Sequence, residues 1–240
     1  MINIICFYWQ GERWQKKDKL TGGFKSHLKK VGKVSNSLAS KYVNNLYYGV
    51  NKFTTNNFKF ICFTNSNLDL DKNIEIRNFP LLTSKGVLPR LYMFSREAGL
   101  FGNQIFCLDI DIIITGSLKP FINYSGTFCS RNDFKKNGQL DGDIMSFYAG
   151  KETENIFWKP FIKNVKEAEQ MTSGRESLWI RHVANDLADR WGNIAPGKIA
   201  SYKRDIKKWG YIPEKTSIIS FHGYPRPHQV NEKWINKYWE

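Results

Sequence analysis

Two aspartates separated by a single residue carry the clearest chemical signal in the sequence. Asp109 and Asp111 flank Ile110 in the apolar stretch FCLDIDIII. We expect residues 104–114 to form one buried strand, in which side chains two positions apart project to the same face. Two carboxylates side by side among apolar residues repel each other and are costly to bury unpaired. A divalent cation removes this penalty, and Mg²⁺ or Mn²⁺ commonly binds one or two carboxylates together with water and substrate phosphate.

The alternative is a strand that ends early and leaves both aspartates in a solvated turn. The apolar run 112–114 directly after the pair disfavours this alternative. A D-x-D triplet alone is a weak indication of function, because such triplets recur by chance.

A second group of chemically useful residues follows an apolar run near the carboxyl end, in the stretch SFHGYPRPH. His222 stands at the end of a predicted strand, 217–221, and Gly223 opens a rigid turn with two prolines. A neutral imidazole is a good third ligand for Mn²⁺, and the guanidinium of Arg226 can hold a diphosphate through paired donors. A lone histidine after a strand is more often a hydrogen-bonded structural residue. Because the chain also contains a carboxylate pair, we favour the role of metal ligand for His222.

The elements that would position these residues alternate between strand and helix. Strands are predicted at 2–9, 58–64, 74–77 and 104–114, around Phe128, and at 144–148 and 217–221, and helices at 35–51, 89–98, 152–164 and 176–191. Alternation in the first half predicts an α/β fold with a mostly parallel sheet flanked by helices, and the second half predicts a smaller extension. In such a sheet ligands bind beyond the carboxyl ends of the strands, where the aspartates would lie.

Composition limits the classes of protein to consider. With 240 residues, 41% of them hydrophobic, the chain can bury a core and is not a disordered protein. Its apolar runs are far shorter than the roughly 20 residues that span a bilayer. Its start lacks the pattern of a signal peptide, so we expect a cytoplasmic protein. The four cysteines lie in apolar runs, which predicts buried, reduced thiols.

The formal net charge of +14 favours an anionic partner, such as nucleic acid, a phosphate-bearing substrate or an acidic membrane surface. A compositional bias towards Lys and Asn explains the charge equally well. The densest group of lysines lies in the stretch 16–33, which we expect to be a long loop. The aromatic, basic tail 234–239 is predicted to cap the core, with peripheral contact to an anionic membrane as the alternative.

Together, FCLDIDIIITGSL and SFHGYPRPH resemble D-x-D glycosyltransferases of the GT-A fold, close to glycosyltransferase family 8. In that family the first run supplies metal-binding aspartates, and the second supplies a histidine ligand and a basic residue for the diphosphate. The resemblance implies Mn²⁺ or Mg²⁺ bound by Asp109, Asp111 and His222. It implies contacts to a nucleotide sugar from Asp109, Ile110, Gly223 and Arg226. It also implies one Rossmann-like domain over 1–240, with 1–125 holding the nucleotide and 126–240 the sugar and acceptor.

The resemblance extends to segments that would hold the nucleotide, which it implies to be UDP-linked. Tyr8 and Trp9 would flank the base, although packing in the core explains these two aromatic residues equally well. Thr64 and Asn65 would hydrogen-bond the edge of the base, and Arg90 would reach the ribose or diphosphate. The acceptor implied is a glycan, a lipid-linked sugar or a protein.

Two segments depart from the family pattern on the sugar side. A family run N-S-S-x-M is replaced by DGDIMS, and G-D-Q is replaced by GRE. We take Asp141, Asp143 and Glu176 as the catalytic candidates that orient sugar hydroxyls or the acceptor. Asp141 and Asp143 equally fit a solvated turn beside Gly142. The family implies retention of the anomeric configuration, but the sequence shows no dedicated nucleophile.

Two other classes of protein remain. The charge, the aromatic content and the paired aspartates also suit a nucleic-acid-binding protein or a metal-dependent nuclease. No helix-turn-helix, RRM or zinc-finger pattern is present, so we expect no nucleic-acid partner. The third hypothesis is a sugar-binding relative that lacks catalytic activity. The presence of Asp109, Asp111 and His222 argues against this hypothesis.

Overall fold

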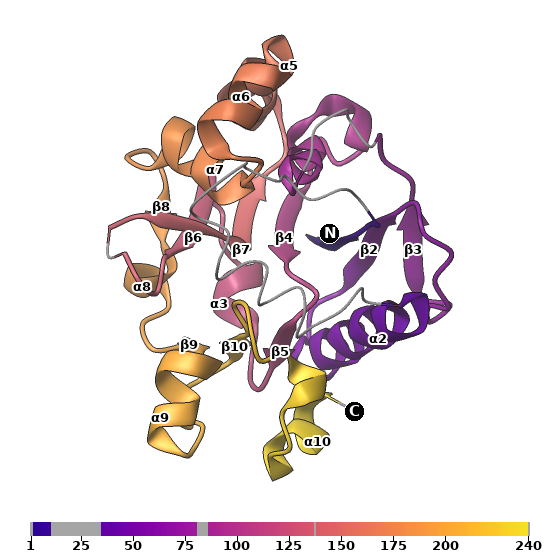
Figure 1. The fold of residues 1–240 in the computed structure, drawn as a ribbon, viewed down its shortest axis with the longest axis vertical. Coiled ribbons are helices and arrows are strands. Elements are labelled where there is room, and N and C mark those ends of the chain that lie inside the picture. The colour runs from indigo at the N-terminus through magenta and orange to yellow at the C-terminus, as the bar shows by residue number, and fades with distance from the viewer. Residues whose placement is uncertain (1, 11–34, 81–85, 137, 240) are drawn as a thin grey trace.

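The computed structural model describes residues 2–10, 35–80, 86–136 and 138–239. Its centre is a seven-stranded sheet in the order β3-β2-β1-β4-β7-β6-β8 (Figure 1). These strands are β1 (Ile2–Tyr8), β2 (Phe58–Thr64), β3 (Ile74–Arg77), β4 (Gln104–Leu108), β6 (Phe128–Asn132), β7 (Leu140–Tyr148) and β8 (Asp189–Arg190). Strands β3, β2, β1 and β4 are parallel, and β7 runs antiparallel to β4 and β6. The predicted α/β class is confirmed.

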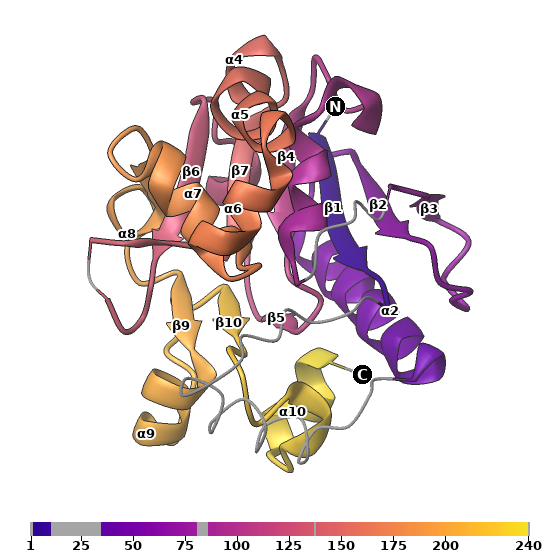
Figure 2. The same ribbon diagram turned by 45° about the horizontal axis from the view of Figure 1, so that its top comes forward.

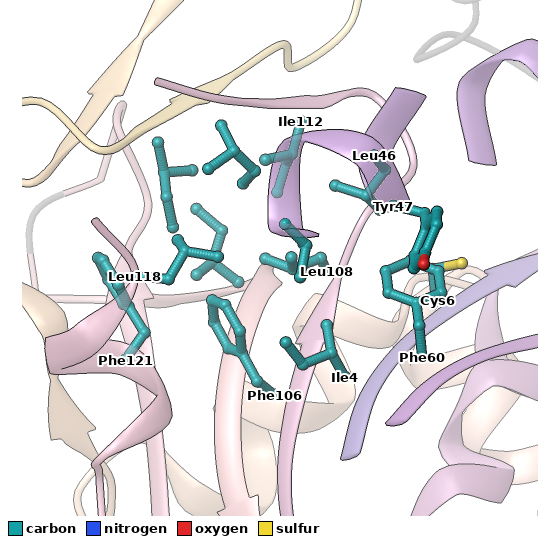
Figure 3. Packing of buried hydrophobic residues seen from close by; sticks show 14 of the residues in the cluster. Ile4, Cys6, Leu46, Tyr47, Phe60, Phe106, Leu108, Ile112, Leu118 and Phe121 are labelled. Atoms are coloured by element: carbon teal, nitrogen blue, oxygen red, sulfur yellow. The ribbon is translucent and has the colours of Figure 1, made fainter. Parts of the chain in front are cut away.

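One face of the sheet is covered by α2 (Asn36–Phe53), α3 (Lys119–Ile122) and α8 (Trp191–Ile194). Ser35 starts α2 by accepting a hydrogen bond from the amide of Leu38, as expected of an N-cap serine. Leu46 of α2 packs in the same cluster as Ile4 and Phe106 of the sheet (Figure 3). Alternate residues of β1 belong to opposite clusters, so both faces of the strand are buried.

The other face is covered by short helical segments. They are η1 (Leu88–Phe94), η2 (Arg96–Ala98), α4 (Lys151–Thr153), η3 (Glu154–Trp158), α5 (Lys159–Lys163), α6 (Val165–Thr172) and α7 (Glu176–Ala184). Phe94 of η1 and Phe157 of η3 stack with ring centroids 4.2 Å apart. This contact joins the segment that precedes β4 to the segment that follows β7. The helix predicted at 152–164 is confirmed as the continuous series α4, η3 and α5.

A three-stranded sheet lies beside the larger one, in the order β5-β10-β9 (Figure 2). Its strands are β5 (Ile112–Ile114), β9 (Ile199–Ser201) and β10 (Ile218–Ser220). The segments η4 (Tyr202–Ile206), α9 (Lys207–Trp209), η5 (Pro227–Gln229) and α10 (Lys233–Trp239) complete this part. Trp239 is 3% exposed and packs on Tyr42 of α2, so the predicted capping role of the tail is confirmed.

Strands from residues 1–125 and from 126–240 contribute to both sheets, and the separate roles predicted for these halves remain predictions. Cys6, Cys62, Cys107 and Cys129 are buried and free, as predicted. Within the described residues, no helix has the length and apolar character needed to cross a membrane. The lysine-rich stretch 16–33 lies outside the described residues.

Besides the strand predicted at 104–114, which divides into β4 and β5, three predicted elements differ from the structure. The helix predicted at 89–98 is two 3₁₀ segments separated at Ser95, whose extended backbone and side-chain cap start the second one. The helix predicted at 176–191 ends at Ala184, because the chain turns back to add β8 to the sheet. The strand predicted at 144–148 begins earlier, at Leu140.

Candidate active site

Polar residues gather where the parallel strands β2, β1 and β4 end, at one edge of the large sheet. Tyr8 and Thr64 are paired at the carboxyl ends of β1 and β2. Asp109 directly follows β4, and its amide donates a hydrogen bond of 2.9 Å to the carbonyl of Asp143 in β7. The carboxyl ends of neighbouring strands are the usual ligand-binding edge of an open α/β sheet.

The D-x-D residues occupy a turn, so the single strand predicted at 104–114 is wrong. Strand β4 ends at Leu108, and the chain crosses to the small sheet, where β5 begins at Ile112. A hydrogen bond of 3.3 Å from the amide of Ile112 to the carbonyl of Asp109 closes the turn. Asp111 is 7% exposed, whereas the side chain of Asp109 is 41% exposed. The two carboxylates therefore have different surroundings, because the chain changes sheets between them.

Arg90 holds the first of these aspartates. Its Nη1 lies 2.5 Å from Oδ1 of Asp109 and 3.2 Å from Oε2 of Glu176. Arg90 is 6% exposed, so its pair with Glu176 is buried, whereas its pair with Asp109 reaches the surface through the aspartate. Arg90 thus joins the end of β4 to the start of α7, and contact with a ribose or diphosphate remains a prediction.

Glu176 is the first residue of α7 and is 3% exposed. Burial raises the pKa of its carboxyl to about 8, although Arg90 opposes the shift. Within the described part of the chain, Oε1 of Glu176 has no hydrogen-bond partner. Oε2 would lie 3.2 Å from a Cβ at position 142, so Gly142 allows the glutamate to lie close to β7. This buried acid is protonated in much of the population at neutral pH.

Arg131 binds the two aspartates of β7. It lies where the register between β6 and β7 shifts, and such bulges redirect a side chain. Its guanidinium approaches Asp141 to 2.9 Å and Asp143 to 2.6 Å, and it stacks over the ring of Phe134 at 3.8 Å. Because Asp141 and Asp143 belong to a strand and are ion-paired, the alternative of a solvated turn is wrong.

Asp143 also joins the two sheets. Its Oδ2 accepts a hydrogen bond of 2.6 Å from the hydroxyl of Ser220 in β10. Burial and the charge of Asp143 raise the pKa of Asp141 to about 6. The pair of carboxylates therefore shares one arginine inside a region that disfavours further negative charge.

His222 follows β10 and lies over the same cluster. Its Nε2 is 2.7 Å from the hydroxyl of Ser201, and its ring stacks on Phe134 with centroids 5.2 Å apart. Burial and the charge of Lys203 lower the pKa of His222 to about 4, so the imidazole is neutral. Gly223 has φ +83°, which a residue with a Cβ adopts only with strain.

The predicted metal ligands are of suitable chemical types, but the structure does not group them around one ion. Two carboxylates and a neutral imidazole are suitable donors for Mn²⁺. In the structure, however, Asp111 forms an ion pair with Arg226, and Arg226 also bonds to the carbonyl of Phe221. Among the described residues no three His, Cys, Asp or Glu side chains are grouped so that they could hold a metal ion. The predicted triad of Asp109, Asp111 and His222 is therefore not assembled in this arrangement.

The residues predicted to hold the base have partners within the chain. Thr64 accepts a hydrogen bond from the amide of Ser66, and the amide group of Asn65 bonds to both backbone groups of Phe79. Trp9 is partly buried and packs edge-on against Phe79 at 5.6 Å.

Tyr8 is 8% exposed and lies in the core. Ile110 is partly buried and packs against two hydrophobic clusters. Their contacts to a nucleotide remain predictions.

Sequence reasoning missed Arg131 and Ser220. An arginine that directly follows the apolar run FCS in a predicted strand is a signal of a buried charge that needs a partner. Ser220 gives no such signal, because a serine beside an apolar run is common and its partner is distant in the chain.

The fold matches several solved structures at very low sequence identity. An active-site mutant of LgtC has a TM-score of 0.62 and 10% identity over 98% of this chain and 93% of that chain. GlyE, a glycosyltransferase of Streptococcus pneumoniae, has a TM-score of 0.60 and 12% identity over 99% of this chain and 58% of that chain. The galactosyltransferase LgtC with donor and acceptor sugar analogues has a TM-score of 0.51 and 9% identity over 94% of this chain and 88% of that chain.

The chain thus spans most of LgtC but little more than half of GlyE. No protein-family model matches the sequence, and no curated protein matches it. At such low identity the likeness concerns the fold alone, and it confirms the predicted arrangement: a mostly parallel sheet flanked by helices, as in these glycosyltransferases.

Proposed function

We propose that this chain is a glycosyltransferase that moves a sugar from a nucleotide sugar to a glycan, a lipid-linked sugar or a protein. One observation carries the proposal: in a fold shared with LgtC and GlyE, the Asp109–Asp111 turn follows β4 at the carboxyl edge of the parallel strands. On the basis of the family resemblance, we propose that the donor is a UDP-sugar and that the anomeric configuration is retained.

Arginines at this edge suit a diphosphate. Arg226 and Arg90 are ion-paired to Asp111 and Asp109, which follow one another in the same turn. A bound diphosphate would compete with the carboxylates for these guanidinium groups, since paired N–H donors bind phosphate as well as carboxylate. Trp9, partly buried at the end of β1, is the aromatic residue that we propose beside the base.

We include Mn²⁺ or Mg²⁺ in the proposal as a ligand of Asp109 and Asp111. When bound, such an ion would neutralise charge on the departing diphosphate. Arg226 contacts Oδ2 of Asp111, so an ion bound at that oxygen would compete with the guanidinium and release it towards the diphosphate. The pairing with Arg226 therefore predicts that metal and diphosphate bind together more strongly than either binds alone.

The sugar would lie near the carboxylates of β7 and α7. Glu176, with a pKa raised to about 8 by burial, can donate a hydrogen bond from its protonated carboxyl at neutral pH. Asp141 and Asp143 are held by Arg131, which fixes their orientation towards hydroxyl groups. Each carboxylate of the site forms an ion pair with an arginine, which weakens it as a nucleophile.

The decisive experiment is a thermal-shift titration with UDP, GDP and CMP, each with and without Mn²⁺. We expect a rise in melting temperature with UDP that is largest with Mn²⁺, since a ligand that binds only the folded state stabilises it. Asp111→Asn should lose the dependence on Mn²⁺. The exposed Asp186→Asn is the matched control and should behave as the native chain.

Release of UDP from a panel of UDP-sugars then tests for turnover. A metal-dependent response to GDP instead would keep the transferase and change the donor. No response to any nucleotide would contradict the proposal. Nucleotide binding without turnover on any sugar or acceptor would indicate a sugar-binding relative that lacks activity.

A further inference from the structure

The helical segment after β9 connects the candidate active site to an exposed aromatic surface. At its start, Ser201 bonds to the imidazole of His222, and Lys203 donates to the carbonyl of His222 at 3.1 Å. The segment continues through η4 into α9, which ends at Trp209. Tyr202 stacks on Phe221 with centroids 4.5 Å apart, so the segment is anchored to the small sheet.

Two aromatic side chains at the far end of this segment are exposed. Trp209 is 44% exposed and Tyr211 is 62% exposed, and their rings lie 6.4 Å apart at an angle of 31°. Lys207 and Lys208 precede them, and both are exposed. Large aromatic rings beside lysines, on an end of the molecule far from α5 and α6, form an amphipathic surface (Figure 1).

The start of α10 extends this surface. A hollow of about 410 Å³ is lined by residues of both segments, among them Lys207, Lys233, Trp234 and the acidic Glu232. Figure 2 shows α9 and α10 projecting at the same end of the molecule. We call this the docking surface and define it as Lys207, Lys208, Trp209, Tyr211, Lys233 and Trp234.

We propose that the docking surface binds a bilayer that carries anionic headgroups. Tryptophan and tyrosine prefer the membrane interface, because their rings are apolar while their N–H and O–H groups stay hydrated. Lysines near an anionic leaflet are attracted to it. Lys207, Lys208 and Lys233 are cationic and Glu232 beside them is anionic, so the surface carries a net positive charge that is complementary to such a leaflet.

Docking in this way would place the active site one short helix from the bilayer. It would favour a lipid-linked acceptor over a soluble one, and this part of the inference rests on the proposed function. The binding to a bilayer does not rest on it. The two can therefore fail separately.

Co-sedimentation of the full chain with vesicles tests the inference. We expect binding to vesicles of phosphatidylcholine mixed with phosphatidylglycerol, and weak binding to phosphatidylcholine alone. Lys207→Glu with Lys208→Glu should lower the partition coefficient by more than about tenfold, since each lysine contributes about fivefold. Trp209→Ala with Tyr211→Ala should lower binding also at high salt, where charge is screened.

Matched controls lie elsewhere on the surface. Lys163→Glu with Lys166→Glu makes the same change of charge at α5 and α6, and Leu187→Ala removes a side chain that is 70% exposed. Both controls should bind vesicles as the native chain does. Each variant should also keep its thermal response to UDP, which separates loss of docking from loss of the donor site.

Three results would overturn the inference. Failure of the native chain to bind anionic vesicles is the first. Equal losses in the charge control at α5 and α6 would show attraction of the whole chain rather than of this surface. Tighter binding to a soluble polyanion such as dextran sulfate, lost in the same variants, would assign the surface to a polyanionic macromolecule instead.

Discussion

Arg90 and Asp109 form an ion pair in which Nη1 and Oδ1 are 2.5 Å apart, with the arginine buried and the aspartate partly exposed. The same guanidinium reaches Glu176 at 3.2 Å. One cation thus links the turn after β4 to the first residue of α7. Asp109, Arg90 and Glu176 are thus joined in one network of ion pairs, so a ligand that binds one of these side chains also affects the other two.

Replacing Arg90 should destabilise the fold strongly. At pH 9, above the raised pKa of Glu176, Arg90→Met leaves the ionised carboxylate without its cation, and breaking a buried ion pair costs about 3–5 kcal/mol. In Arg90→Met with Glu176→Gln the loss should be smaller than the sum of the single losses, because the uncompensated charge is removed. Urea unfolding of the four proteins measures this coupling. Arg96→Met, at an exposed arginine, should change stability by no more than about 0.5 kcal/mol. Simple additivity would show that Arg90 and Glu176 do not interact.

The raised pKa of Glu176 predicts how stability depends on pH. Glutamate ordinarily titrates near 4.5, and burial raises the pKa of Glu176 to about 8. The stabilising contribution of the protonated form is complete below pH 4.5 and is lost as the pH rises through 8. Relative to Glu176→Gln, the native chain should therefore lose stability from pH 5 to 9, on the order of 3 kcal/mol. Unfolding by denaturant at both pH values tests this, and a constant difference would contradict it.

The hydrogen bond between Ser220 and Asp143 should stabilise the contact between the two sheets. Ser220→Ala removes one of two donors to Oδ2 of Asp143, since Arg131 still donates to it at 2.7 Å, and we expect a loss of about 1 kcal/mol. The exposed Ser37→Ala removes a hydroxyl from α2 and should change stability little. Chemical unfolding measures both variants, and equal values would show that the bond contributes nothing to the fold.

A glycine is required directly after the candidate histidine. Gly223 has φ +83°, and an alanine in this left-handed region costs about 1–2 kcal/mol. We expect Gly223→Ala to lower the melting temperature and to reduce the thermal response to UDP, because His222 and Arg226 flank the turn. Gly192→Ala is the control, since nothing lies within 4 Å of a Cβ at that position and its φ is not positive. An unchanged UDP response in Gly223→Ala would remove this turn from the donor site.

Local patterns in the sequence were sufficient for the main elements. The apolar runs at β1 and β2 and the four-residue spacing in α2 depend on neighbours in the chain, and each lies where it was predicted. The position of Asp109 and Asp111 at the carboxyl edge also follows from the preceding strand. The loop with His222 and Arg226 follows in the same way from the strand before it.

Only the tertiary structure decided what these residues contact. The run 104–114 reads as one strand because its apolar residues are continuous, yet it divides at Asp109 since β4 and β5 belong to different sheets. Arg131 contacts Asp141 and Asp143 where the register between β6 and β7 shifts, and Asp111 meets Arg226 across more than a hundred positions. Such pairings depend on segments that meet in space, and no local periodicity encodes them.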